Sequence, residues 1–195
     1  MKYERLINSI MSELKEIYAI EWMGPYDSID EIGYREGAEE CFIYLITGRF
    51  FHNGPMGIRY VGITKRFVGA RLKDKDHQKK QAKLKNKQFW TGRFSVSAYN
   101  NLDTKRRRDR AERVETLLVR YLKSVSDIKM INEKKVYSDP ICPIGVINRW
   151  QKKYSEEGRY NKPSILSKIP DTLLYVDKEF FACDKLKIKN KHKSL

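Results

Sequence analysis

The stretch CFIYLITGRFFHNGPMGIRYVGIT, residues 41–64, contains two short runs that are rich in β-branched and aromatic residues, 41–47 and 58–63. This composition is typical of β-strands, and the turn-forming residues Asn, Gly and Pro lie between the runs at 53–55. The stretch therefore predicts an antiparallel hairpin with a long connection, around which the remaining elements can be placed.

Apolar periodicity predicts the elements on either side of this hairpin. We expect a helix over 3–19, a helix from the N-cap Thr64 to about residue 80, a strand over 93–99, and a helix from 104 to about 125. Together with the hairpin, these elements predict an α+β fold in which helices flank a small three-stranded antiparallel sheet.

The two ends of the chain are predicted to be extensions of this core. The expected division is an N-terminal helical extension with an acidic linker at 1–39, a core domain at 40–134, and a basic C-terminal extension at 135–195. Within the C-terminal extension we expect a short helix at 146–154 with Trp150 buried, and two strands at 172–175 and 180–187.

Composition limits the classes of partner. The 195 residues include 40 Lys and Arg against 25 Asp and Glu, a net charge of +15 that favours a polyanionic partner such as nucleic acid or an anionic membrane. No apolar run approaches the ~20 residues that a membrane-spanning helix needs, and the N-terminus does not resemble a signal peptide. The three cysteines are widely spaced without a CxxC pair, which indicates neither a disulfide framework nor a zinc site. We therefore expect a cytoplasmic protein that does not bind membranes.

Much of the positive charge falls into clusters. Residues 65–87 contain ten Lys and Arg against two acids, and further basic runs lie at 105–113 and 185–193. A solubilising surface is one explanation, but clusters beside a single candidate site favour contact with nucleic-acid phosphates, which supply affinity without reading sequence. The residues expected to bind nucleic acid are Lys65, Arg66, Lys73, Lys79, Lys80, Lys83, Arg106 and Arg107.

Five short motifs follow one another along the chain in a characteristic order. They are Phe42-Ile43-Tyr44, Tyr60-Val61-Gly62, Arg71, Glu115 and Asn132. Over about residues 40–134 the chain resembles the GIY-YIG nuclease family, whose fold is a three-stranded antiparallel sheet flanked by helices. Two departures are that Phe42 replaces the usual glycine and that the two tyrosines are more widely spaced.

This resemblance implies a metal-dependent endonuclease that hydrolyses phosphodiester bonds of nucleic acid, with double-stranded DNA as the expected substrate. Glu115 would hold one divalent cation, Mg²⁺ or Mn²⁺, and Arg71 would neutralise charge on the phosphoryl oxygens. One tyrosine, with Tyr44 favoured, would activate the attacking water, and Tyr60 would help to fix the phosphate. Asn132 would be the late asparagine that closes the family's domain.

The position one helical turn after Arg71 stays open. Many family members carry a histidine or tyrosine there, whereas this chain has Lys75, with His77 two residues further on. On a regular helix positions 71 and 75 share a face, which favours Lys75, but a shift in register would bring in His77.

The alternatives belong to other functional classes. Lys75 in this position supports a catalytically weak or inactive nucleic-acid-binding module on the same fold. A basic structural RNA-binding protein would explain the charge but not the ordered motifs. Whether the chain is a homodimer also stays open.

Overall fold

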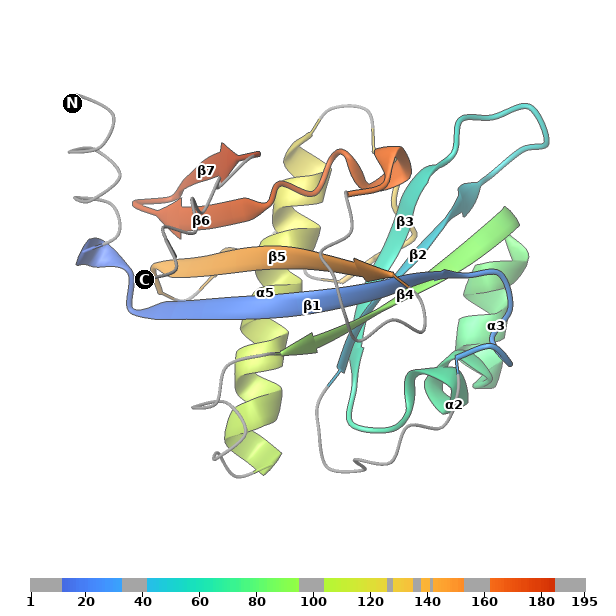
Figure 1. Ribbon diagram of the computed structural model, residues 1–195, viewed down its shortest axis with the longest axis horizontal. Coiled ribbons are helices and arrows are strands. Elements are labelled where there is room, and N and C mark those ends of the chain that lie inside the picture. Colours follow the sequence, from blue (N-terminus) through green and yellow to red (C-terminus); the bar gives the residue numbers. More distant parts are fainter. Residues whose placement is uncertain are drawn as a thin grey trace, which may run out of the picture.

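One continuous sheet of seven strands organises the structure, in the order β3-β2-β4-β1-β5-β6-β7 (Figure 1). The computed structural model describes residues 12–32, 42–94, 104–125, 128–134, 138–140, 142–152 and 162–184. The strands are β1 (Glu16–Tyr26), β2 (Phe42–Arg49), β3 (Gly57–Thr64), β4 (Lys85–Phe94), β5 (Ile144–Lys152), β6 (Thr172–Val176) and β7 (Glu179–Cys183). All neighbouring strands are antiparallel except β1 and β5, which run parallel.

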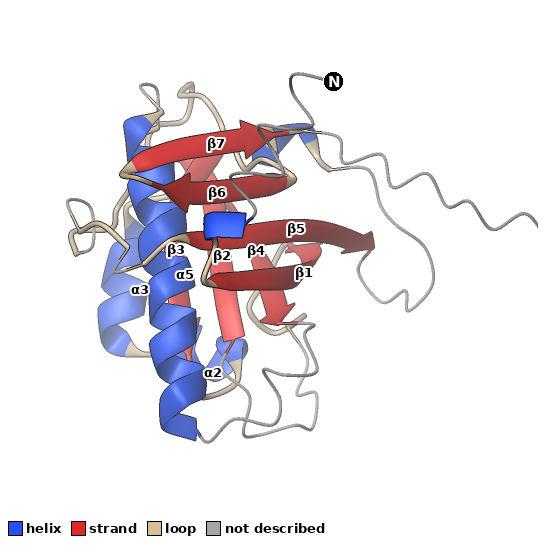
Figure 2. Ribbon diagram, turned by 90° about the vertical axis from the view of Figure 1, so that its left-hand side faces the viewer, coloured by secondary structure: helices blue, strands red, loops and turns tan. Residues whose placement is uncertain are grey.

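Helices lie on both faces of this curled sheet. Their bounds are α2 (Val68–Leu72), α3 (Lys75–Ala82) and α5 (Thr104–Ser124), with a short 3₁₀ helix, η1 (Ser164–Leu166), before β6. The long helix α5 crosses the strands on one face, as Figure 2 shows. The short helices α2 and α3 lie at the other side of β2 and β3 (Figure 1).

The main hydrophobic core lies between α5 and the sheet. One face of α5 is fully buried because its apolar residues recur every three or four positions, among them Val114, Leu118 and Leu122. These side chains belong to the same buried cluster as Trp22 of β1 and Trp90 of β4. The curled sheet thus wraps a single helix with side chains from most of its strands.

Strand β2 is buried on both faces, which explains its continuous apolar sequence. Ile43 and Leu45 point into the main core, whereas Tyr44 and Ile46 point into a second, smaller core. This second core also contains residues of α2, such as Leu72. The candidate tyrosines therefore face α2 and α3.

The outer edge of β3 is covered by residues 131–132. The backbone N–H of Ile131 donates to the carbonyl of Arg59 at 2.7 Å. The Asn132 side chain accepts from the N–H of Val61 at 3.0 Å and donates to its carbonyl at 2.8 Å. An amide side chain thereby replaces a neighbouring strand at an edge that would otherwise leave backbone groups unpaired.

The predicted fold class is wrong. The three strands β3, β2 and β4 are adjacent and antiparallel, but they form less than half of a seven-stranded mixed sheet. Strands from all three predicted segments share that sheet, with β1 from the N-terminal segment inserted between β4 and β5. The expectation failed because residues 16–19 of β1 and 146–152 of β5 were assigned to helices, and residues 20–26 were assigned to no strand.

Several element boundaries also differ from the expectation. Residues 1–11 of the expected N-terminal helix lie outside the described residues, and 16–26 form β1 with Tyr18, Ile20 and Trp22 buried at a period of two. The expected helix at 146–154 is β5, in which Val146, Asn148 and Trp150 alternate inward. The third strand begins at Lys85 rather than 93, and residues 95–99 lie outside the described residues.

Other expectations are confirmed. The β2–β3 hairpin, the long helix from 104 and the buried Trp150 are all present. Strands β6 and β7 form the expected C-terminal hairpin, with positive φ at both turn residues, Asp177 and Lys178. In the part of the chain that the structure describes, no helix is both long and apolar enough to cross a membrane.

Candidate active site

The two candidate tyrosines lie side by side on the face of the sheet that meets α2 and α3. Tyr44 is opposite Gly62 in the β2–β3 register, and Tyr60 is opposite Ile46, so the tyrosines are diagonal neighbours. Their rings stack with centroids 5.9 Å apart and an interplanar angle of 28°. Tyr44 is 1% exposed and Tyr60 is 9% exposed, so Tyr60 is the one closer to solvent.

Gly62 makes this stacked arrangement possible. A Cβ atom at position 62 would lie 2.5 Å from the Tyr44 hydroxyl oxygen and 2.7 Å from Cε1 of Tyr60. No side chain can occupy that space while both rings keep their places. Position 62, the last of the second tripeptide, must therefore be glycine for both tyrosine rings to fit.

His77 completes the aromatic cluster. Its ring packs edge-on against Tyr44 at 5.9 Å and against Tyr60 at 5.5 Å between centroids. Its Nε2 lies 3.3 Å from the Tyr44 hydroxyl, whereas its buried Nδ1 has no hydrogen-bond partner among the described residues. Burial, with Arg71 and Lys80 nearby, lowers the pKa of His77 to about 4, so the imidazole is neutral at pH 7.

A break between two helices brings in His77 in place of Lys75. Helix α2 ends at Leu72 and α3 begins at Lys75, so positions 71 and 75 do not share one helix. The chain turns at 73–74, and α3 then directs His77 to the tyrosines while Lys75 is exposed. The face argument that favoured Lys75 assumed one continuous helix, and the structure has two.

Arg71 lies between the tyrosines and the surface. Its Nη1 donates to Asp74 Oδ2 at 2.7 Å, and Arg66 donates to the same carboxylate oxygen. These two hydrogen bonds, first that from Arg71, lower the pKa of Asp74. Burial by itself would lower the pKa of Arg71, but Asp74 and Tyr44 raise it overall, so the guanidinium is a permanent cation.

Glu115 contributes a buried carboxylate from α5. It is 9% exposed, and its negative charge acts on both tyrosines. Burial raises the pKa of Tyr44 and Tyr60, and Glu115 adds to this effect, whereas Arg71 opposes it in both. Both phenols are therefore protonated at neutral pH and can serve as hydrogen-bond donors.

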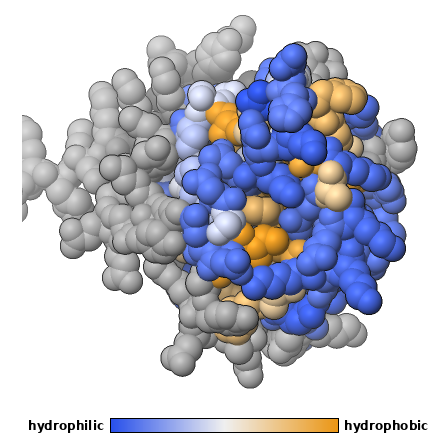
Figure 3. Space-filling model, turned by 90° about the vertical axis from the view of Figure 1, so that its right-hand side faces the viewer, coloured by the Kyte–Doolittle hydropathy of each residue, from blue (hydrophilic) through white to orange (hydrophobic). Residues whose placement is uncertain are grey.

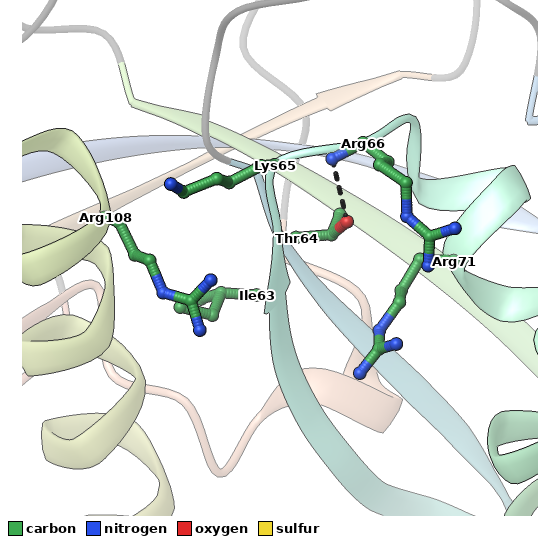
Figure 4. A pocket seen from close by; sticks show the side chains of 6 residues that line it. All are labelled: Ile63, Thr64, Lys65, Arg66, Arg71 and Arg108. Carbon is green, nitrogen blue, oxygen red and sulfur yellow. Dashed lines mark hydrogen bonds between the residues drawn. The ribbon is translucent and has the colours of Figure 1, made fainter. Parts of the chain in front are cut away.

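A basic pocket of about 220 Å³ opens beside this cluster. It is lined by Ile63, Thr64, Lys65, Arg66, Arg71 and Arg108. Figure 4 shows Arg108 of α5 on one side of it and, on the other side, Arg71 of α2 with Lys65 and Arg66 from the segment between β3 and α2. The pocket thus places Arg71 in a concave cationic surface that suits an anion.

Arg108 is the functional candidate that the sequence reasoning missed. It lies on α5 and donates to Glu112, four residues later, at 2.7 Å. Positions 108, 112 and 115 follow one face of α5, so Arg108 and Glu115 are turned in similar directions. This spacing was the available signal, since it singles out Arg108 within the basic run at 105–113.

Only some of the residues predicted to bind nucleic acid lie at or near this pocket. Lys65 and Arg66 line the pocket, and Lys80 Nζ lies 5.5 Å from the Tyr60 ring centroid. Lys73 pairs with Asp30 at 2.8 Å, and the remaining candidates Lys79, Lys83, Arg106 and Arg107 are exposed or partly exposed outside this pocket. Thr64 is no helix cap; its hydroxyl accepts from the N–H of Arg66 at 3.0 Å.

Comparison with known proteins adds no family assignment. The chain matches no protein-family model, no curated protein and no solved structure. The GIY-YIG resemblance therefore stays a prediction that rests on the residues themselves.

The close approach at Gly62 generates a first test. Gly62→Ala should lower the free energy of unfolding by about 1–3 kcal/mol, because an overpacked site must displace one ring. Urea denaturation measures the loss. Gly57→Ala on the same strand is the matched control, since its Cβ would meet only the Arg59 side chain, at 3.6 Å. Equal effects of the two changes would contradict the role given to Gly62.

The buried, neutral His77 generates a second test. Between pH 4 and 6.5 the unfolded chain binds a proton at residue 77 that the folded chain excludes, so the free energy of unfolding rises with pH across this window. The rise is at most roughly 3 kcal/mol. His77→Gln should remove it, as urea unfolding at pH 4.5 and 6.5 will report. If the free energy of unfolding of His77→Gln depended on pH as strongly as that of the wild type, a depressed pKa of His77 would be refuted.

Proposed function

We propose that the chain is a metal-dependent endonuclease of the GIY-YIG type that hydrolyses phosphodiester bonds of DNA. The observation that carries the proposal is the cluster of Tyr44, Tyr60, Arg71, His77 and Glu115. The rings of Tyr44, Tyr60 and His77, from β2, β3 and α3, pack against one another. Arg71 of α2 and Glu115 of α5 act on both tyrosines electrostatically. A cluster of two phenols, an imidazole, a guanidinium and a carboxylate beside a cationic pocket supports phosphodiester chemistry.

A divalent cation fits this site through Glu115. No group of three or more His, Cys, Asp or Glu that could hold an ion occurs among the described residues. Mg²⁺ commonly takes only one or two protein carboxylates and completes its shell with water and substrate phosphate, so one buried carboxylate is an adequate anchor. When bound, Mg²⁺ or Mn²⁺ would polarise the scissile phosphate and stabilise the leaving oxygen.

Proton transfer in the proposed mechanism runs through Tyr44 and His77. A neutral phenol with a raised pKa is a poor base by itself. In the tautomer with its proton on Nδ1, His77 can accept the Tyr44 hydroxyl proton at Nε2, 3.3 Å away. Tyr44 can then take a proton from the attacking water as it gives its own to His77, so no free phenolate forms.

Arg71 and Tyr60 are assigned to the phosphate. Arg71 is a permanent cation that lines the basic pocket and also acts on Tyr44. Its fixed donors suit the charge that develops on phosphoryl oxygens. Tyr60, more exposed than Tyr44, is a neutral donor that can hydrogen-bond the same group.

Plasmid nicking tests the function directly. With Mg²⁺, the wild-type chain should nick supercoiled DNA, and Glu115→Gln should reduce nicking at least about 100-fold while binding persists. Glu179→Gln on the distant edge strand β7 makes the same chemical change as a control. No nicking by the wild type, with binding intact, would favour the inactive binding module. A structured RNA in a parallel assay separates the two nucleic acids.

The pocket predicts how binding depends on salt. In a Glu115→Gln background, Arg108→Gln should lower the slope of log affinity against log salt by about one, because one phosphate contact is lost. Lys123→Gln removes the same charge at the other end of α5 and should leave the slope unchanged. If the slope of log affinity against log salt were the same in both variants, Arg108 would not be part of the phosphate-binding surface.

A further inference from the structure

The tip of the β2–β3 hairpin presents a phenyl ring to solvent. Phe51 is 73% exposed, and the only other exposed large hydrophobic residue among those described is Ile17, at 42%. The face that Figure 3 shows, on the side of this hairpin, is otherwise largely hydrophilic with small hydrophobic patches. Exposure of so large an apolar side chain has an energetic cost in water unless something covers it.

The tip that carries Phe51 is braced by hydrogen bonds. The N–H of Gly54 donates to the Phe51 carbonyl at 3.1 Å, which closes a turn directly after the ring. Arg49 Nη1 donates to the carbonyl of His52 at 2.9 Å. The backbone around the exposed ring is therefore held on both sides, so little ordering is needed when the ring meets a partner.

A buried arginine fixes the base of the tip. Arg59 donates to the carbonyls of Gly48 at 3.0 Å, Pro55 at 2.6 Å and Lys129 at 3.1 Å. Its guanidinium lies 4.9 Å from the Phe50 ring centroid, and Lys129 Nζ lies 5.1 Å from the same centroid. Phe50 thus packs against the residues that hold the tip, whereas the Phe51 ring points into solvent.

The surroundings of Phe51 suit a nucleic acid. Arg49, whose Nη1 bonds the His52 carbonyl, and the exposed Lys129, beside the Phe50 ring, place positive charge near the tip. The sequence from 48 to 64 contains no Asp or Glu. An exposed aromatic ring with cations nearby, on a hairpin that itself carries no acids, is the combination by which proteins stack on bases while the cations follow the phosphates. A hydrophobic protein partner would not explain the cations.

We propose that Phe51 stacks on an unpaired base of the nucleic acid that the active site cleaves. This inference rests on the proposed function, because it requires nucleic-acid binding. Tyr44 and Phe51 are seven residues apart along β2 and its continuation, at most about 23 Å at ~3.3 Å per residue. That distance is about seven base-pair steps of ~3.4 Å, so the tip contacts the substrate well away from the scissile phosphate. Preference for a substrate with unpaired bases would arise there.

Tryptophan fluorescence tests the inference directly. The native tryptophans Trp22, Trp90 and Trp150 are buried, which leaves a new indole at the tip as the exposed reporter. In a Glu115→Gln background, Phe51→Trp should be quenched on addition of an oligonucleotide duplex with one unpaired base, and much less by the fully paired duplex. Ile17→Trp places the same reporter at the other exposed hydrophobic position and should not be quenched.

Affinity provides a second readout. Phe51→Ala should weaken binding of the duplex with the unpaired base about tenfold without changing the salt slope, because no charge is removed. Binding with no quenching in Phe51→Trp, or equal quenching by both duplexes, would overturn the inference and leave the proposed nuclease function standing. Failure of every variant, and of the parent, to bind nucleic acid would instead overturn the proposed function itself.

Discussion

The parallel pairing of β1 with β5 is the interaction on which the rest of the structure depends. The two strands are in register from Glu16 with Ile144 to Gly24 with Lys152. On its other side β1 pairs with β4, so it joins the antiparallel strands of the candidate site to the C-terminal hairpin. Without β1, the edge of β4 and one wall of the core around α5 would be exposed to water.

Side-chain hydrogen bonds hold this pairing in one register. Trp22 Nε1 donates to Asn148 Oδ1 at 2.8 Å across the two strands, and Asn148 Nδ2 donates to the carbonyl of Pro170. Both side chains are buried, so a slip of one residue would leave polar groups unpaired in the core. Arg113 of α5 also pairs with Glu16 at the start of β1. The register between β1 and β5 is thereby specified far from the tyrosines.

The range of the interactions explains which features the sequence could predict. The β2–β3 and β6–β7 hairpins and the helix α5 are local, and turn residues or helical periodicity are sufficient to find them. The parallel pair β1–β5 brings together Trp22 and Asn148, which are 126 positions apart in the sequence. No local sequence pattern predicts a pairing over that separation. In the candidate site, the order of residues along the chain led to the prediction of Tyr44, Tyr60, Arg71 and Glu115. It could not choose between Lys75 and His77, since that choice depends on a helix break at 73–74.

The candidate site has an enclosed region and an open region, and Arg71 contributes to both. Tyr44 and His77 are enclosed, and both are neutral because desolvation opposes their charged forms, so they suit proton transfer. The pocket beside them is open and cationic, so it suits phosphate. Arg71 lines the pocket and also acts on Tyr44. Burial lowers the pKa of His77 most, and the charges of Arg71 and Lys80 lower it further. An anion bound next to Arg71 would offset part of that charge and so would make the imidazole a stronger proton acceptor. Phosphate binding and base strength would then be coupled through a single guanidinium.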